Sequence, residues 1–374
     1  DLVRSRGLGD VYKRQGQQVP IFTSTVNGAL PANGFIEFYG EVNDGKWERR
    51  MYLEADYQIN DRWSLFTDTA AYFLTVNTNA AQNKRFVTTT NNLGSGLPAE
   101  PYFMHTAATY FRNTINLGFA AVVGSYVYSS AFDKGEGFTS GEFRPNNPLT
   151  NTQSNLFVAS SGPAARLRFS AVGRALNTRT VRVSVNGTVV ANKEMNFFNS
   201  VIDESANNIP LSLLTSNTAS VQFTNTSSEV TDRIVVGMYE LKYPRQFNFG
   251  GQSSFEFELP ASVSGNNLVI DNFNTGGVAP VLYDLTNGLR ITATILSPSQ
   301  VRVVLPASAT DRKLILVSQE PSTIRTVSGF TSRNFINYAI PANQADYIMI
   351  SNPLLYSDAN GINQVEQYRL YRNS

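Results

Sequence analysis

Short alternations of apolar and polar residues recur through the middle of the chain and predict β-strands. In Val181–Val185 the three valines share one face, while Arg182 and Ser184 lie on the other, which is the period of two expected of a half-buried strand. Asn186-Gly187 follows as a hairpin-turn signal. With frequent turn residues between them, such segments predict a β-sandwich. Its strands are expected at 165–172, 180–185, 189–191, 220–224 and 233–238.

A second series of alternations begins after Pro244 and predicts a smaller, immunoglobulin-like sandwich. Asn287-Gly288 is its clearest hairpin signal. Its strands are expected at 255–259, 268–271, 279–285, 288–294, 301–305 and 313–317. Ahead of both sandwiches, residues 35–39 alternate as a strand, 64–76 reads as a strand pair or one bent strand, and 103–128 is again apolar and aromatic. The predicted fold class is therefore mainly β, with consecutive jelly-roll or immunoglobulin-like sandwiches.

The last thirty residues follow a different pattern. Residues 347–350 (YIMI) form a short apolar run that predicts a buried strand. Beyond it, the apolar residues Ile362, Val365, Tyr368 and Tyr371 recur at three-residue spacing and predict an amphipathic helix. Candidate caps for that helix are Ser357, Asp358 and Asn360. Because strand, loop and helix open an α/β domain, we expect this segment to begin a domain that is truncated at Ser374.

These patterns divide the chain into five expected regions. Residues 1–15 carry four basic and two acidic residues without apolar periodicity, and we interpret them as a non-native, adapter-like segment. The expected regions are 1–15, the N-terminal β region 16–100, which could fold together with the next region, the β-sandwich 101–246, the immunoglobulin-like domain 247–340, and the α/β start 341–374.

Composition narrows the function classes. The chain is 42% hydrophobic and 11% aromatic, as folded proteins are, while only 16% of its 374 residues are charged, against about a quarter in average domains. A net charge of +1 gives no electrostatic case for nucleic acid or an anionic membrane as a partner. The absence of cysteine excludes disulfides, thiolate metal sites and a cysteine nucleophile within these residues. No apolar run is long enough to predict a membrane span.

Few residues are candidates for catalysis or ligand binding, and each has a structural interpretation that we favour. His105 is the only histidine, and nothing nominates the partners that a catalytic triad would need. The acidic residues near the N-terminus could form a glycosidase-type pair, and two tryptophans could stack on sugars. Surface ion pairing and core packing are the expected roles instead. These residues are Glu37, Glu41, Glu48, Glu54, Trp47 and Trp63.

Two tight loops carry oxygen ligands of the kind that calcium binds. One holds Asp133 and Glu136, and the other Asn43, Asp44 and Gly45. Neither has the alternating acidic spacing of a full calcium loop, so we expect turn chemistry and keep calcium only as an alternative cofactor. A further loop at 94–96 (GSG) lacks the lysine and helix of a phosphate-binding loop. No catalytic, cofactor-binding or metal-binding residue is therefore assigned.

Four phrases of the sequence resemble one protein family. They are FIEFYGEVNDGKWERRMY (35–52), SLFTDTAAYFLTV (64–76), FDKGEGF (132–138) and ADYIMISNPLL (345–355). In this order they are similar to the N-terminal region of the gingipain-like C25 cysteine peptidases of Bacteroidota, most of all the PorU-like sortases of the type IX secretion system. The last phrase is similar to the first strand of that family's caspase-like catalytic domain. No position matches the family's catalytic His or Cys.

The resemblance implies a role for the chain within a larger protein. In that family a Cys thiolate attacks a peptide carbonyl with His as the base, and the sortase branch cleaves C-terminal sorting signals from exported cargo at the outer-membrane surface. This chain would be an exported, non-catalytic scaffold whose partners are the downstream catalytic domain, secretion components and cargo. The alternatives are a surface carbohydrate-binding or adhesin-like protein, which exposed coplanar aromatic rings on one sheet face would favour, and a free-standing structural protein.

Overall fold

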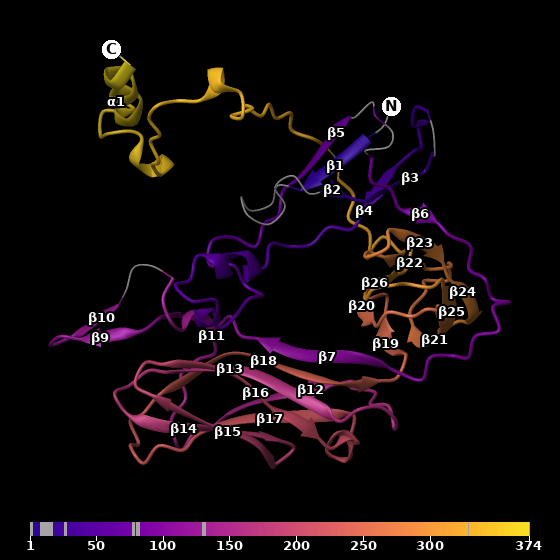
Figure 1. Ribbon diagram of the computed structural model, residues 1–374, viewed down its shortest axis with the longest axis horizontal. Coiled ribbons are helices and arrows are strands. Elements are labelled where there is room, and N and C mark those ends of the chain that lie inside the picture. Colours follow the sequence, from indigo (N-terminus) through magenta and orange to yellow (C-terminus); the bar gives the residue numbers. More distant parts are fainter. Residues whose placement is uncertain are drawn as a thin grey trace. The chain divides into compact units, whose positions relative to one another are not determined.

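The computed structural model describes residues 3–7, 18–25, 28–76, 79, 83–128, 132–327 and 329–373. It confirms the mainly β fold class, since sheets dominate and one short α-helix lies near the C-terminus (Figure 1). The chain divides into two compact units, Asp1–Ile324 and Arg325–Ser374. No helix in the described ranges is long and apolar enough to cross a membrane.

The first sandwich packs two four-stranded antiparallel sheets face to face. Their strand orders are β12-β17-β14-β15 and β16-β13-β18-β7. The strands are β7 (Phe103–Tyr110), β12 (Leu149–Ser154), β13 (Ala165–Gly173), β14 (Thr178–Val185), β15 (Thr188–Asn196), β16 (Ser200–Ile209), β17 (Thr218–Asn225) and β18 (Ile234–Arg245). A 3-10 turn, η4 (Leu211–Leu214), links β16 to β17.

The alternation in β14 builds the core of this sandwich as the sequence predicts. Val181, Val183 and Val185 are fully buried among apolar side chains of both sheets, while intervening Arg182 is exposed. The hairpin from β14 to β15 turns at Asn186-Gly187, whose φ angles are 47° and 82°, a conformation that glycine adopts without strain. The predicted hairpin is therefore confirmed.

The second sandwich pairs a four-stranded with a five-stranded sheet. The strand orders are β19-β21-β25-β24 and β20-β26-β22-β23-β6. The strands are β6 (Val87–Thr88), β19 (Asn248–Gln252), β20 (Ser254–Leu259), β21 (Asn266–Phe273), β22 (Val281–Asp284), β23 (Leu289–Thr292), β24 (Thr294–Ser297), β25 (Gln300–Leu305) and β26 (Arg312–Val317). The predicted turn at Asn287-Gly288 connects the paired strands β22 and β23. Phenylalanine and aliphatic side chains fill the interior.

The N-terminal region forms small sheets and turns. These are β1 (Val3–Gly7) between β2 (Gln18–Val19) and β5 (Tyr72–Val76), β3 (Ile21–Thr23) with β4 (Ile36–Phe38), η1 (Gly45–Arg50), η2 (Ala55–Tyr57), β8 (Thr114–Leu117) with β11 (Glu136–Thr139), and β9 (Ala120–Val122) with β10 (Tyr126–Tyr128). Thus part of the segment interpreted as non-native forms a strand, and the rest of 1–15 lies outside the described residues. Of 64–76, only Tyr72–Val76 is a strand.

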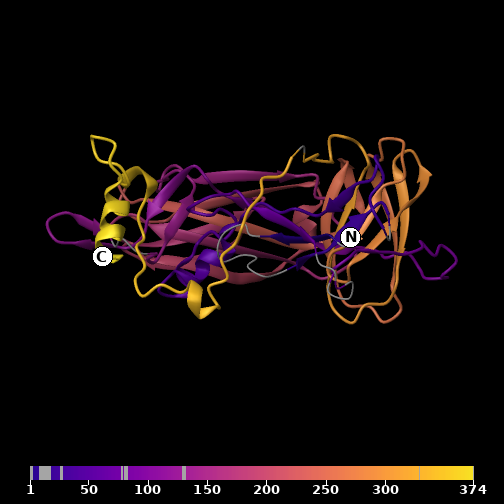
Figure 2. The ribbon, with the colours of Figure 1, turned by 90° about the horizontal axis from the view of Figure 1, so that it is seen from above.

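The N-terminal region lies against both sandwiches rather than around a core of its own. The Asn60 Nδ2 donates hydrogen bonds to the carbonyls of Phe111, Phe138 and Gly237 at 2.9–3.2 Å. Residues 85–101, purple in Figures 1 and 2, follow the second sandwich, where the Asn91 side chain bonds both the N–H of Val304 and the carbonyl of Arg302. The region therefore depends on the sandwiches for its structure.

The second unit contains the predicted helix but not the predicted strand. Helix α1 (Gln364–Asn373) follows two 3-10 turns, η5 (Pro341–Asn343) and η6 (Pro353–Leu355). Residues 347–350 form no strand, and Ile348 and Ile350 are 80% and 96% exposed. The expectation of a buried strand is wrong for this unit because a strand needs a hydrogen-bonded partner, and none is found in the described part of the unit.

The cap of α1 also differs from the expectation. The Asn363 side chain accepts a hydrogen bond from the N–H of Glu366 at 2.9 Å, the usual N-cap contact. Asp358, one of the three candidates, instead accepts from the N–H groups of Asn360 and Ile362. Its carboxylate therefore closes the loop ahead of the helix.

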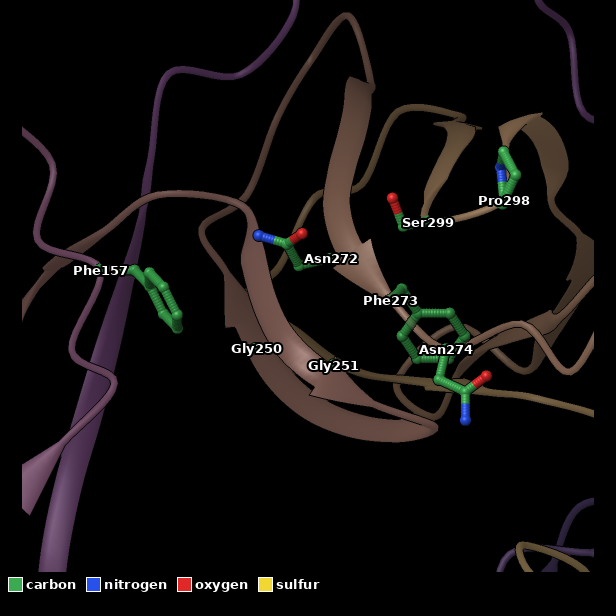
Figure 3. Close-up of a pocket in the computed structure, with 8 residues that line it drawn as sticks. All are labelled: Phe157, Gly250, Gly251, Asn272, Phe273, Asn274, Pro298 and Ser299. Atoms are coloured by element: carbon green, nitrogen blue, oxygen red, sulfur yellow. The ribbon is translucent and has the colours of Figure 1, made fainter.

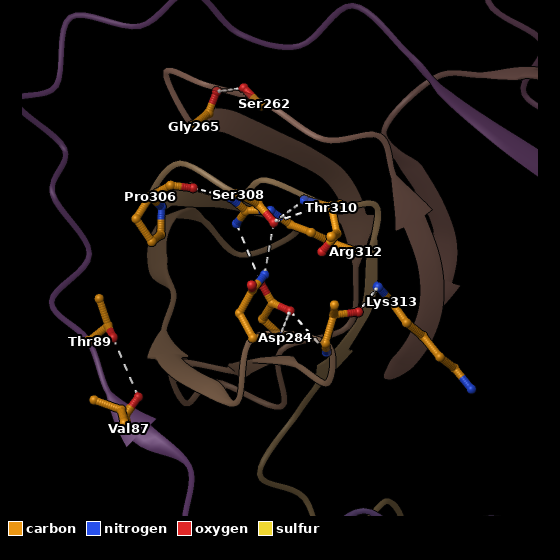
Figure 4. Close-up of polar contacts among 12 residues, drawn as sticks. Val87, Thr89, Ser262, Gly265, Asp284, Pro306, Ser308, Thr310, Arg312 and Lys313 are labelled. Atoms are coloured by element: carbon orange, nitrogen blue, oxygen red, sulfur yellow. Dashed lines mark hydrogen bonds and ion pairs between the residues drawn. The ribbon is translucent and has the colours of Figure 1, made fainter.

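Each sandwich buries one arginine–aspartate pair completely. In the first, Asp232 accepts two hydrogen bonds of 2.7 Å from Arg179. In the second, Arg312 lies 3.4 Å from Asp284 and donates to the carbonyl of Pro306 (Figure 4). Burial alone would raise the pKa of Asp232, but the bonds from Arg179 and two asparagines outweigh it and hold that pKa below its usual range. Asp232 is therefore a charged component of the core.

We expect Asp232→Asn to destabilise the first sandwich by about 3–5 kcal/mol, because the Arg179 charge would stay buried without a counter-ion. Urea unfolding followed by intrinsic fluorescence measures the loss. The matched control is Asp56→Asn, which breaks an ion pair of similar length, 2.8 Å, whose carboxylate is 84% exposed, and it should cost less than about 1 kcal/mol. Equal losses in the two variants would contradict a structural role for the buried pair.

The stability difference between wild type and Asp232→Asn should also depend on pH. A lowered folded pKa means that the charged pair stabilises the fold above the unfolded pKa of about 3.9 and loses that contribution as pH falls through the folded pKa. Unfolding curves between pH 6 and pH 2 should thus show a constant difference down to about pH 5 and a shrinking one below it. A difference that grows on acidification would refute this sign.

Candidate functional site

The strongest candidate site is a groove where the two sandwiches meet, which we call the junction groove. It has a volume of about 390 Å³, within the usual range for ligand sites. Its walls come from β7, the end of β12, β18, β19 and β20. The lining side chains include His105, Gln153, Arg245 and Glu256, so both charges and neutral polar groups converge on it.

Arg245 is the buried cation of this groove. It is 4% exposed, and its guanidinium donates to the carbonyls of Asn155 and Asn248 at 2.7–3.1 Å. The aromatic rings of Phe157 and Phe255 lie 5.1 and 5.2 Å from the guanidinium carbon. Carbonyl dipoles and ring faces thus stabilise the charge, as cation–π contacts do.

His105 lies beside this cation among aromatic rings. Its ring centroid is 5.4 Å from that of Phe255, 5.8 Å from that of Phe103 and 5.9 Å from that of Tyr243. Burial, and then the positive charge of Arg245, lower the pKa of His105 to about 4. The imidazole is therefore neutral at pH 7, and its ring packing agrees with the structural role that the sequence suggested.

The backbone around the groove adopts unusual conformations. Asn155 and Phe157 have φ angles of 57° and 44°, a region that aromatic residues rarely adopt. Two hydrogen bonds hold Phe157 there, one from its N–H to the Asn217 side chain at 2.6 Å and one from the Gln246 N–H to its carbonyl at 2.9 Å. Strained backbone of this kind clusters at binding sites.

A second pocket, of about 460 Å³, adjoins the junction groove through Gly250 (Figure 3). In Figure 3 the ring of Phe157 stands on one side of the Gly250-Gly251 strand, and Asn272, Asn274 and Ser299 lie on the other. Amide and hydroxyl groups with two aromatic rings, those of Phe157 and Phe273, suit a neutral polar ligand, and the residues lining this pocket include no acid or base for catalysis.

The two tryptophans are not open stacking platforms. The Trp63 Nε1 donates to the carbonyl of Tyr110 at 3.0 Å, and the Arg112 guanidinium lies 4.5 Å above its ring. Trp47 is covered in the same way by Arg50 at 4.9 Å. Packing against the protein therefore accounts for both rings.

The acidic residues named from the sequence bind different partners. Glu37 lies 3.3 Å from Arg290 and Glu41 lies 2.6 Å from Lys313, both cations of the second sandwich. Buried Glu48 accepts from the hydroxyl of Ser64 and the N–H of Leu65, and Glu54 is exposed ahead of η2. Glu37 and Glu41 therefore form ion pairs, and Glu48 holds the loop at Ser64 by hydrogen bonds.

The candidate calcium loops are also turns in the structure. Asp133 accepts from the N–H of Lys134, and Glu136 accepts from the N–H of Asp133. Asp44 accepts from the N–H of Lys46 and so caps η1. No group of three or more His, Asp or Glu side chains placed to hold a metal ion occurs among the described residues.

Apart from His105, sequence reasoning did not nominate the residues that define the junction groove. Arg245 follows Pro244, where the sequence suggests only a boundary between sandwiches. Asn155 and Phe157 lie in a loop without any motif. Their chemistry arises because β7, β18 and β20 meet, and no local pattern signals that meeting.

Comparisons with known proteins give structural similarity only. No protein-family model and no curated protein matches the sequence. Dimeric latent PorU from Porphyromonas gingivalis is similar at 13% identity and a TM-score of 0.49, over 84% of this chain and 29% of that protein. The carbohydrate-binding module CBM36, solved with calcium and xylotriose, is similar at 12% identity and a TM-score of 0.23, over 36% of this chain and 98% of the module. Values this low assign neither family nor function.

Because His105 is the only histidine, its imidazole resonance can be assigned without ambiguity. We expect it to titrate with a pKa of about 4 in the folded chain, against about 6.5 for an unperturbed histidine. A carbon–proton correlation spectrum recorded from pH 3 to pH 8 measures the midpoint. Arg245→Met should raise the midpoint only in part, because burial is the larger cause. A midpoint at or above 6.5 in the wild type would disprove the burial of this ring.

Proposed function

We propose that the chain is the non-catalytic, N-terminal β portion of a gingipain-like C25 cysteine peptidase of the type IX secretion sortase branch, exported to the cell surface. The activity of that whole protein is the cleavage of C-terminal sorting signals from exported cargo. The two sandwiches and the N-terminal region hold the catalytic domain in place. The 374 residues contain no cysteine, so the nucleophile belongs to a part of the protein outside them.

The observation that carries this proposal is the exposed apolar surface of the second unit. Phe330, Ile348, Ile350 and Leu354 are 77–96% exposed, and several tyrosines and leucines beside them are also exposed. Burying such side chains would gain about 25 cal/mol per Å², so their exposure favours a partner that covers them. An α/β domain that adds strands beside 347–350 would cover these side chains.

The sequence phrases that resemble the C25 family support the same assignment. Two of them, 35–52 and 64–76, lie in the N-terminal region that contacts both sandwiches. A third, 132–138, includes the turn ahead of β11 and the first three residues of that strand. In the proposal these phrases form the scaffold.

The alternative is a surface carbohydrate-binding or adhesin-like protein. The pocket beside Gly250 offers amide and hydroxyl groups that a neutral sugar could bind. The aromatic rings that would have to stack on sugars are instead covered by guanidinium groups, at Trp47, Trp63 and Phe157. This coverage favours the scaffold over the sugar-binding function.

Extending the source DNA past the codon for Ser374 tests the proposal. We expect the reading frame to continue for about 200 residues or more, the size of a full α/β domain. The translation should place a His and then a Cys at strand ends, as a thiolate mechanism with a histidine base requires. A stop codon directly after Ser374 would refute the peptidase assignment and favour the binding alternative.

A further inference from the structure

Strand β7 has an open edge inside the junction groove. It is the last strand of its sheet, paired on one side with β18 only. Its residues 103–110 (FMHTAATY) include no charged residue and no proline, which are the usual devices that protect a sheet edge from pairing with another chain. By comparison, β20, the edge strand across the groove, carries Glu256 and Glu258.

Two hydrogen bonds reveal which backbone groups of β7 point outward. In antiparallel pairing, directly opposite residues either bond each other or both face away. The Pro244 carbonyl accepts from Ala159, so Pro244 and its opposite residue Met104 face away from each other. At the other end, the Tyr110 carbonyl accepts from the Trp63 side chain and also points outward.

Because bonded and outward-facing pairs alternate along an antiparallel ladder, every second residue between Met104 and Tyr110 also faces away from β18. Thr106 and Ala108 direct their N–H and C=O groups away from β18. Among the described residues, no hydrogen bond to these outward groups is found. Unpaired backbone groups at a sheet edge are a template for another strand.

The groove includes this edge as well as part of one face of the sheet. Four consecutive residues of β7, 105–108, line it. Because successive side chains of a strand point to opposite faces, four consecutive residues can line one groove only if the groove reaches around the backbone edge, while Tyr243 and Arg245 of β18 extend it over one face of the sheet. The facing wall comes from Ser254, Phe255 and Glu256 of β20.

We propose that the junction groove binds an extended segment of a partner polypeptide, which adds to the first sandwich as a strand beside β7. The segment's main chain bonds the N–H and C=O groups of Thr106 and Ala108, the recognition mode known as β-augmentation. The neutral ring of His105 and the polar side chain of Gln153 lie beside its side chains. This inference does not depend on the peptidase assignment.

The test uses the full chain and a phage-displayed library of random octapeptides. Peptides are selected on the wild type after depletion on Thr106→Pro, then synthesised with fluorescein and measured by fluorescence anisotropy. Proline at 106 removes an outward N–H but keeps the hydrogen bonds between β7 and β18. Edge strands accept proline where the N–H faces solvent. We expect Ala108→Pro, which plays no part in the depletion, to weaken binding about tenfold or more, and Thr106→Ala, which retains the N–H, to weaken it less than about twofold.

A second measurement on the wild type covers the case in which Thr106→Pro does not fold. A selected peptide is N-methylated at each position in turn, and strand addition predicts that binding falls at every second position, because alternate N–H groups face β7. Ala108→Pro should reproduce the effect of Thr106→Pro. The proposal is overturned if no peptide survives the depletion step, if Ala108→Pro binds like wild type, or if the N-methyl series shows no alternation.

Discussion

The aromatic cluster around Phe103 is the contact on which the arrangement of the two sandwiches depends. Phe103 begins a strand of the first sandwich, yet its ring is buried in the core of the second, 5.0 Å from the ring of Phe247 and 5.5 Å from that of Phe257. Behind it, the rings of Phe249 and Phe255 are stacked at 4.1 Å. Because the whole of β7 pairs with residues 238–245 of β18, the two strands enter this cluster together. Aromatic pairs of this kind stabilise a contact beyond the area that they bury.

That contact also explains the chemistry of the junction groove. The chain passes from β18 directly into β19, so Arg245 lies between the two cores and is desolvated by both. Its charge is tolerated because carbonyl groups and ring faces surround it. Burial, and then this charge, lower the pKa of the neighbouring His105. The same geometry leaves the edge of β7 beside β20 without pairing the two strands. The packing of the two sandwiches around Phe103 thus produces a buried cation, a neutral histidine and an open sheet edge.

The remaining parts of the chain differ in how far they can be stable alone. Each sandwich has its own core and one fully buried ion pair. The N-terminal region has strands of two to five residues, too short for independent stability, and it is held by side chains such as Asn60 and Asn91 that bond the sandwiches. The second unit exposes most of its large apolar side chains, so its structure provides little burial of its own.

The sequence by itself determined the mainly β class, the inward valines of β14, the turns at Asn186-Gly187 and Asn287-Gly288, and the helix that became Gln364–Asn373. Each depends on periodicity or turn chemistry within a few residues. Only the tertiary structure decided that residues 347–350 form no strand, because a strand requires hydrogen bonds to a neighbouring strand and its own apolar pattern does not supply them. The same reason applies to Arg245 and to the open edge of β7, since burial and free edges are properties of how distant strands meet.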